Sequence, residues 1–362
     1  MAFGNNKDKE PIDFNAYGLK PTGFYLDSLK ELGDTLDEMQ LSSDAAKELL
    51  NSMDEAEAAA RKLINETGGE LAMLSTDAPK TEAEKSPETP DLNELLAELD
   101  SLVGLDQIKK NVKSLINLVK VRKLREESGL PSPAISLHLV FMGNPGTGKT
   151  TVARLIAQLY YAIGVLSKGQ LVEVDRSGLV AGYVGQTAIK TSEVIKKALG
   201  GVLFIDEAYS LANETAGGDF GQEAIETILK AMEDHRDDFV VIVAGYEELM
   251  EKFISSNPGL ESRFNRYFVF EDYTGDQLYQ IFISMCDKNK YVLDEDADKF
   301  ARKHFEDLYQ QRDENFGNAR HVRNTFENVI SIHSDRVAFI DSPTRDDLMT
   351  IKLEDIEAAA AM

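Results

Sequence analysis

The stretch Gly143-Asn144-Pro145-Gly146-Thr147-Gly148-Lys149-Thr150-Thr151 decides the fold of this chain. An apolar run typical of a buried strand, Ile135 to Met142, precedes it, and Val152–Tyr161, with the pattern of a helix, follows it. Strand, Gly-x-x-x-x-Gly-Lys-Thr and helix in this order predict a P-loop, whose backbone N–H groups point at phosphate oxygens. Lys149 would neutralise the β- and γ-phosphates, and the hydroxyl of Thr150 would bind Mg²⁺. The stretch therefore predicts a nucleoside triphosphate site formed by Asn144, Pro145, Gly146, Thr147, Gly148, Lys149, Thr150 and Thr151.

A second apolar run, Val202–Ile205, ends in the two acids Asp206 and Glu207. Two acids at a strand end can be a simple solvated cap. Their place one crossover after a P-loop instead predicts a Walker B segment. We expect Asp206 to share the Mg²⁺ ion with Thr150, and Glu207 to polarise the attacking water as general base. The pair therefore favours hydrolysis over mere binding of the nucleotide.

Composition narrows the class of protein. The chain has 362 residues, of which 43% are hydrophobic, so it can bury a sizeable core. The single cysteine, Cys286, excludes internal disulfides and suits a reducing cytoplasm. Residues 1–10 are polar and charged, so we expect no signal peptide there, and no apolar run is long enough to insert into a membrane. A formal net charge of −24 argues against nucleic acid as the main partner.

The pattern along the chain predicts an α/β fold with a parallel five-stranded sheet. Apolar runs at 135–142, 171–174, 202–205, 239–243 and 267–270 alternate with helical segments, as in a sheet covered on both faces. After residue 274 the pattern is helical only. Residues 1–100 hold 9 basic and 23 acidic side chains, and two amphipathic helices are expected within 24–66. The predicted domains are an acidic helical extension at 1–74, a flexible linker at 75–90, the α/β domain at 91–273, and a helical lid with a C-terminal tail at 274–362.

Several further motifs carry a resemblance to a known family. Together with the P-loop and Asp206-Glu207, the segments LVGL (102–105), SRFNR (262–266) and GNAR (317–320) resemble an AAA+ ATPase. More narrowly, VLFIDEAYSL (202–211), GQEAI (221–225), VAGY (243–246) and NPG (257–259) resemble the CbbX/SpoVK branch, with red-type Rubisco activase and type VII secretion ATPases. The resemblance covers about residues 95–340. It implies ATP and Mg²⁺ as ligands, a homo-hexameric ring and a protein client.

The resemblance also implies roles for individual residues. Val103 and Gly104 would line the adenine pocket. Arg263 and Arg266 resemble arginine fingers that reach the γ-phosphate of a neighbouring subunit, and Arg320 resembles sensor 2. Arg263 or Arg266 alone could equally be a surface residue, and the alternative for Arg320 is an ordinary salt bridge on a helix surface. Tyr246 stands where many members carry the sensor 1 asparagine, and we expect it only as a candidate for that role.

Between Gly182 and Gly185, the pair Tyr183 and Val184 resembles a pore loop that grips a polypeptide. The alternative is a buried tyrosine beside a turn. A glycine-rich segment at 213–221 is a second candidate pore loop. We therefore expect a remodelling or threading ATPase. Two alternatives stay open: a nucleotide-gated scaffold that recruits partners through residues 24–66, and a nucleic-acid-dependent ATPase, which the acidity disfavours.

Overall fold

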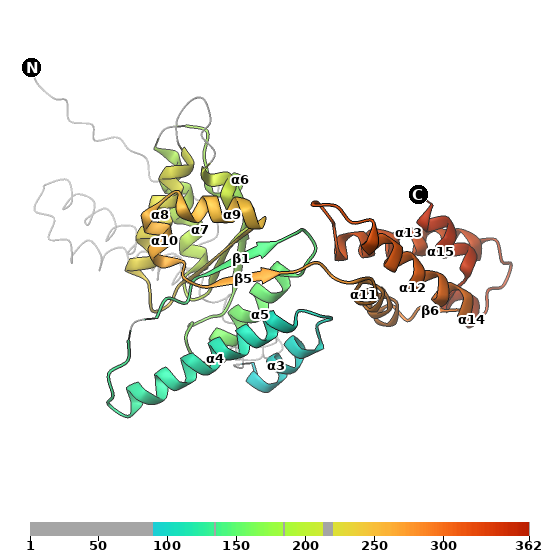
Figure 1. Ribbon diagram of the computed structural model, residues 1–362, viewed down its shortest axis with the longest axis horizontal. Coiled ribbons are helices and arrows are strands. Elements are labelled where there is room, and N and C mark those ends of the chain that lie inside the picture. Colours follow the sequence, from blue (N-terminus) through green and yellow to red (C-terminus); the bar gives the residue numbers. More distant parts are fainter. Residues whose placement is uncertain (1–89, 134, 184, 213–219, 362) are drawn as a thin grey trace, which may run out of the picture. The chain divides into compact units, whose positions relative to one another are not determined.

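The computed structural model describes residues 90–133, 135–183, 185–212 and 220–361 (Figure 1). All of them belong to one compact unit that spans Glu88–Met362. The predicted extension at 1–74, the linker up to residue 89, Val184 and residues 213–219 of the second candidate pore loop lie outside the described residues.

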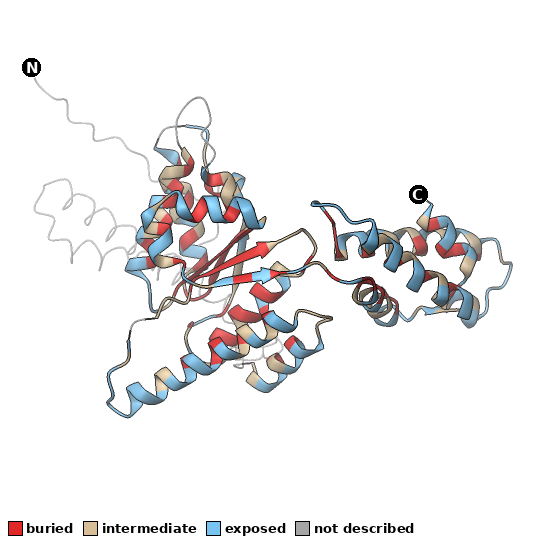
Figure 2. Cartoon of the chain, in the orientation of Figure 1, coloured by how far each residue is buried: buried red, intermediate tan, exposed pale blue. Residues whose placement is uncertain are grey.

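Five parallel strands form the central sheet, in the order β2-β3-β4-β1-β5. Their bounds are β1 Leu139–Gly143, β2 Leu171–Val174, β3 Val202–Ile205, β4 Val240–Gly245 and β5 Tyr267–Phe270. Strands β3 and β4 are buried along their whole length, which is why they read as continuous apolar runs (Figure 2). The predicted fold class is confirmed. Because all five strands are parallel, their carboxyl ends meet at one edge, where the P-loop and the two acids follow β1 and β3.

Helices cover both faces of the sheet, and alternate residues of each strand pack into two separate hydrophobic cores. Leu139 and Phe141 face the core made with helices α3, α4 and α5. Val140 and Met142 face the opposite core, made with α6 to α10. The helices are α3 Leu92–Ser101, α4 Asp106–Glu127, α5 Lys149–Ala162, α6 Arg176–Leu179, α7 Gln186–Ala198, the 3₁₀ helix η2 Ala208–Ala212, α8 Phe220–Asp234, α9 Glu247–Ser255 and α10 Pro258–Arg263.

The first strand starts later than the sequence pattern predicts. The apolar run begins at Ile135, but pairing with β4 begins only at Leu139, opposite Ile242. Just before the strand, Nδ1 of His138 accepts a hydrogen bond from the backbone N–H of Val241 at 3.0 Å. A side chain thus takes the donor that a longer β1 would use, so the ladder cannot extend. The helix after the P-loop begins at Lys149, three residues before the predicted Val152.

A third core belongs to the lid, which contains helices α11 Gly275–Lys288, α12 Glu295–Gln310, α13 Ala319–Ala338, α14 Arg345–Met349 and α15 Leu353–Ala360. The prediction of helices alone is wrong here in one detail. Strands β6 Val292–Leu293 and β7 Thr350–Ile351 form a short parallel pair. Two residues are too few to produce a strand period in the sequence, and this pairing depends on lid packing instead.

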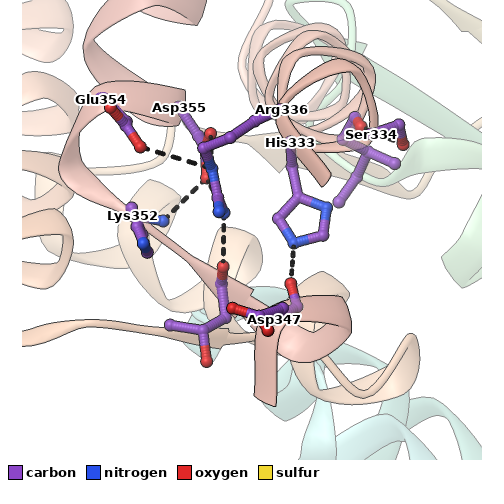
Figure 3. Close-up of polar contacts among 9 residues, drawn as sticks. His333, Ser334, Arg336, Asp347, Lys352, Glu354 and Asp355 are labelled. Carbon is purple, nitrogen blue, oxygen red and sulfur yellow. Dashed lines mark hydrogen bonds and ion pairs between the residues drawn. The ribbon is translucent and has the colours of Figure 1, made fainter. Parts of the chain in front are cut away.

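A buried ion pair fastens the end of α13 to the chain around α15 (Figure 3). Nε and Nη2 of Arg336 each lie 2.8 Å from an oxygen of Asp355, and Nη2 also donates to the carbonyl of Thr350. Asp355 is fully buried, and it also accepts the backbone N–H of Lys352. This bidentate pair fixes the lid's C-terminal segment, because removing Arg336 would leave the buried carboxylate of Asp355 uncompensated.

Among the described residues, none of the helices combines the length and the apolar composition needed to cross a bilayer.

Candidate nucleotide-binding site

The P-loop runs from the end of β1 at Gly143 to the start of α5 at Lys149. Gly148 is the N-cap of α5, with φ of 96°, a backbone conformation that residues other than glycine rarely adopt. No side chain caps the helix at this position. The first-turn N–H groups are therefore available to an anion, and the helix dipole adds to their attraction.

Lys149 is the first residue of α5, and its side chain reaches back to the start of the P-loop. Its ammonium donates to the carbonyl oxygens of Gly143 and Asn144, each at 2.8 Å. Burial lowers the pKa of Lys149 to about 8; the charge of Asp206 opposes this shift, and that of Arg320 adds to it. A buried ammonium whose pKa is lowered gains from a further negative partner, and a phosphate would supply that charge.

The two predicted acids follow β3 at the same edge of the sheet. The backbone N–H of Asp206 donates to the carbonyl of Val174 at 2.8 Å, and this bond holds the end of β3 against β2. Glu207 has φ of 48°, and its N–H donates to Oδ1 of Asp206 at 3.1 Å. Left-handed backbone at a residue other than glycine costs on the order of 1 kcal/mol or more and is concentrated at functional sites. The turn leaves the carboxylate of Glu207 exposed.

These groups meet in one cavity of about 430 Å³, a size usual for small-molecule sites. The residues that line it come from the P-loop and α5, from the ends of β3 and β4, and from the start of α13. They are Gly143, Pro145, Gly146, Gly148, Lys149, Thr150, Thr151, Arg154, Asp206, Glu207, Gly245, Tyr246, Ala319, Arg320 and Arg323.

Most of the predicted nucleotide residues are therefore brought together, including Arg320 from the lid. Arg154 and Arg323 were missed by the sequence reasoning. Each lies about one helical turn beyond a predicted residue, Arg154 after Thr150 and Arg323 after Arg320. This spacing on one helix face was the signal that could have found them.

Two predicted P-loop residues, Asn144 and Thr147, are not among the residues that line the cavity. The hydroxyl of Thr147, which is fully buried, donates to the carbonyl of Asn144 at 2.8 Å. The amide of Asn144 donates to both oxygens of Asp272 at 3.0 and 3.2 Å. Thr147 thus shapes the turn from within, whereas Asn144 ties the turn to the chain that follows β5.

Val103 and Gly104 are not among the residues that line this cavity. Gly104 has φ of 61°, and a Cβ there would lie 2.7 Å from Nε2 of Gln277 in α11. The segment thus passes close to the start of the lid, and its contact with adenine stays a prediction.

The predicted fingers also lie outside the cavity of their own chain. Nη2 of Arg263 lies 3.6 Å from Oε2 of Glu233 in α8, and Nη1 donates to the carbonyl of Gly259 at 3.4 Å. Nε of Arg266 donates to the carbonyl of Ser136 at 3.4 Å.

Tyr246 and Tyr183 have contrasting positions. Tyr246 is the N-cap of α9 and lines the cavity, with its ring centroid 6.2 Å from that of Tyr209. Tyr183 is 73% exposed and is absent from the cavity lining. It precedes α7, whose N-cap Gly185 has φ of 79°. The alternative prediction of a buried tyrosine is therefore wrong.

The donor set fits a hard divalent cation that is shared with a ligand. Among the described residues, no group of three or more His, Cys, Asp or Glu side chains could hold a metal by itself. Thr150 and Asp206 offer one hydroxyl and one carboxylate on the wall of the cavity. Mg²⁺ is commonly held in this way, by one or two protein oxygens together with phosphates and water.

Two family models match the chain. Residues 139–272 match the ATPase family associated with various cellular activities (AAA), and residues 274–362 match the AAA lid domain. The chain is 45% identical to stage V sporulation protein K of Bacillus subtilis over 268 residues, which are 73% of this chain and 82% of that protein. It is 42% identical to the chloroplastic ribulose bisphosphate carboxylase/oxygenase activase of Cyanidioschyzon merolae, over 73% of this chain and 91% of that protein. Protein CbbX of Cereibacter sphaeroides is also 42% identical, over 74% of this chain and 86% of that protein.

Solved structures show the same fold at low identity. The crystal structure of the FIGL-1 AAA domain superposes with a TM-score of 0.51 and 16% identity, over 77% of this chain and 92% of that one.

Proposed function

Because the chain belongs to the AAA+ ATPases, in the branch of CbbX and SpoVK, we propose that it couples Mg²⁺-dependent ATP hydrolysis to remodelling or threading of a protein partner. The family assignment rests on the matches over residues 139–272 and 274–362 and on relatives above 40% identity. The ATPase activity follows from the family. The metal, the ring and the grip on a client are our proposal.

In the proposed reaction the chain holds the triphosphate and prepares water for attack. The N–H groups of the P-loop and the ammonium of Lys149 bind the phosphates. Thr150 and Asp206 would hold Mg²⁺, which would neutralise charge on the phosphate oxygens. The carboxylate of Glu207 accepts a proton from the attacking water, whose oxygen bonds to the γ-phosphorus while the bond between that phosphorus and its bridging oxygen breaks, so that ADP and phosphate leave. Arg320 stabilises charge on the γ-phosphate, and Tyr246, which lines the same cavity, would donate a hydrogen bond there.

A homo-hexameric ring is proposed because the two candidate fingers lie outside the cavity of their own chain. If a guanidinium at that position acts in hydrolysis, it acts on the site of another copy. Arg263 and Arg266 then complete the neighbour's site. In a homo-oligomer with head-to-tail interfaces, each copy gives fingers to one neighbour and receives them from the other.

One observation carries the proposal of threading. Tyr183 has 73% of its surface exposed. An exposed ring beside glycines offers sequence-tolerant apolar contact to an extended polypeptide. Val184, the second residue of the proposed grip, lies outside the described residues.

We also propose a cytoplasmic location, and a protein client in place of nucleic acid. The proposed domains are a nucleotide-binding domain at 91–273 and a lid at 274–362. A scaffold that recruits partners through residues 24–66 is the competing function, and those residues lie outside the described part of the chain.

The experiment is a substrate trap. Glu207→Gln protein is isolated with ATP, and the proteins that stay bound are identified beside those bound by Glu207→Gln/Tyr183→Ala. Remodelling predicts a client that the double variant loses. Retention of the same partners by the double variant, together with their loss when residues 24–66 are deleted, would instead establish the scaffold.

A further inference from the structure

The lid touches the P-loop through a residue whose backbone is unfavourable. Asn318, which precedes α13, has φ of 47° and ψ of −126°, a conformation that suits glycine. It is fully buried. Asparagine at an N-cap normally accepts a hydrogen bond from the helix it begins, but this side chain makes no such bond. A residue that is strained, buried and not used as a cap is expected to have another role.

The side chain of Asn318 instead forms hydrogen bonds with the nucleotide-binding domain. Its Oδ1 accepts the backbone N–H of Tyr273 at 2.9 Å, and its Nδ2 donates to Oδ1 of Asp272 at 2.7 Å. Further acceptors for the same amide are the carbonyls of Phe316 at 3.0 Å and of Pro145, within the P-loop, at 3.3 Å. Asn318 therefore links the first turn of α13 to the P-loop directly.

Asp272 is the second half of the link. One carboxylate accepts hydrogen bonds both from Asn318 of the lid and from Asn144 of the P-loop. A charged acceptor shared by two amides makes stronger bonds than neutral pairs do. A shift of the P-loop at Asn144 therefore acts on the Asp272 carboxylate, which also holds the lid through Asn318.

The backbones are close as well. The N–H of Ala319 donates to the carbonyl of Gly146 at 3.2 Å. A Cβ on Gly146 would lie 2.3 Å from the carbonyl oxygen of Gly317 and 2.8 Å from the nitrogen of Arg320. Gly146 is therefore needed for the approach of the lid, in addition to the approach of phosphate.

We propose that Asn318 and Asp272 are positioning residues, which tie the P-loop to the start of α13 and so place Arg320 against the phosphates. Arg320 and Arg323 follow Asn318 directly on α13 and line the cavity, whereas Asn318 and Asp272 do not. The inference rests on the proposed role of Arg320 in hydrolysis.

The test measures ATP turnover and ADP affinity of the full chain in Asn318→Gly, Arg320→Ala and the double variant. Glycine relieves the unfavourable backbone at 318, which offsets part of the stability lost with the side-chain hydrogen bonds, and the melting temperature of each variant is measured to confirm that it is folded at the assay temperature. We expect Asn318→Gly to lower kcat between about ten- and a hundredfold, the cost of a misplaced group. ADP affinity should change less than about threefold, because the P-loop is intact. In the Arg320→Ala background the same substitution should cost less than about twofold, since the group that it positions is gone.

Exchanging the side chains of positions 318 and 272 provides a second test of the inference. Asn318→Asp sets two carboxylates together, and adding Asp272→Asn restores one donor and one acceptor, so the double variant should regain part of the lost kcat. Normal turnover by Asn318→Gly would overturn this inference and leave the proposed function intact. The same holds if the kcat loss of the double variant equals the product of the losses of Asn318→Gly and Arg320→Ala. Normal turnover by Arg320→Ala would overturn the proposed role of Arg320 first, and the inference with it.

Discussion

Nη2 of Arg263 lies 3.6 Å from Oε2 of Glu233, and the two side chains are 29% and 59% exposed. Exposed ion pairs of this kind contribute about 1 kcal/mol or less, so the guanidinium is held only loosely. The backbone beside it is fixed, because the hydroxyl of Ser136 donates to the carbonyl of Arg263 at 2.6 Å and Phe264 is buried. A guanidinium that is weakly paired, on a backbone that is held in place, can change partner and reach a neighbouring site.

The first prediction follows from this geometry. Arg263→Ala should bind ATP normally but hydrolyse it on the order of a thousandfold more slowly, because the transferring phosphoryl group loses its added cation. Mixing this variant with Lys149→Ala, itself inactive, should restore some turnover. About a quarter of the interfaces in a random ring would then unite an intact P-loop with an intact finger.

The control is Arg236→Ala, because Arg236 also pairs with Glu233, at 3.8 Å, but is no candidate finger. Its turnover should match that of the parent chain. If mixtures stay inactive at every ratio although subunit exchange is demonstrated, the fingers do not act between copies.

A second prediction separates binding from chemistry. Lys149→Ala should lose most of its ATP affinity, because the phosphates lose a buried cation. Glu207→Gln should keep that affinity and hydrolyse on the order of a hundredfold or more slowly, since an amide accepts no proton. Nucleotide titration and single-turnover hydrolysis measure the two effects, and normal turnover by Glu207→Gln would show that another group is the base.

A third prediction concerns stability and pH. Burial lowers the pKa of His138 from 6.5 to about 4, and the charge of Arg263 adds to the shift. The unfolded chain therefore binds a proton between pH 6.5 and 4 that the folded chain does not. The stabilisation is complete above pH 6.5 and is lost as the pH falls toward 4. At pH 5 the loss due to this residue should be about 2 kcal/mol.

The matched variant is His138→Asn, which keeps an acceptor for the N–H of Val241 and cannot titrate in this range. Denaturant unfolding at pH 7.5 and pH 5 measures the difference. The parent protein should lose about 2 kcal/mol more than the variant. Equal losses in both proteins would mean that His138 is already charged in the folded state.

The sequence predicts those parts of the site that depend on local patterns. The P-loop and Asp206-Glu207 each follow a strand directly, so strand, turn and function are encoded within a few residues. Asp272 and the side chain of Asn318 were missed, although GNAR was recognised, because their roles depend on contact between the lid and the P-loop. No local pattern encodes such a contact.

The same division applies to the fold. Buried parallel strands are continuous apolar runs, and four of the five were placed within two residues of their observed bounds. The start of β1 was missed because a side-chain acceptor, His138, ends the ladder. The pair of β6 and β7 was missed because two-residue strands carry no period.

The last prediction tests the grip on the client. Tyr183 is exposed and lies outside the cavity, so Tyr183→Ala should leave basal ATP hydrolysis within a few-fold of normal and the melting temperature unchanged. Remodelling of the client should be lost, because the ring supplies the contact area. Tyr183→Phe should retain most remodelling, since the hydroxyl is not needed. The matched control is Phe339→Ala in the lid, where the ring is 90% exposed but far along the chain from the loop. If Tyr183→Ala remodels as well as Phe339→Ala does, the exposed ring does not grip the client.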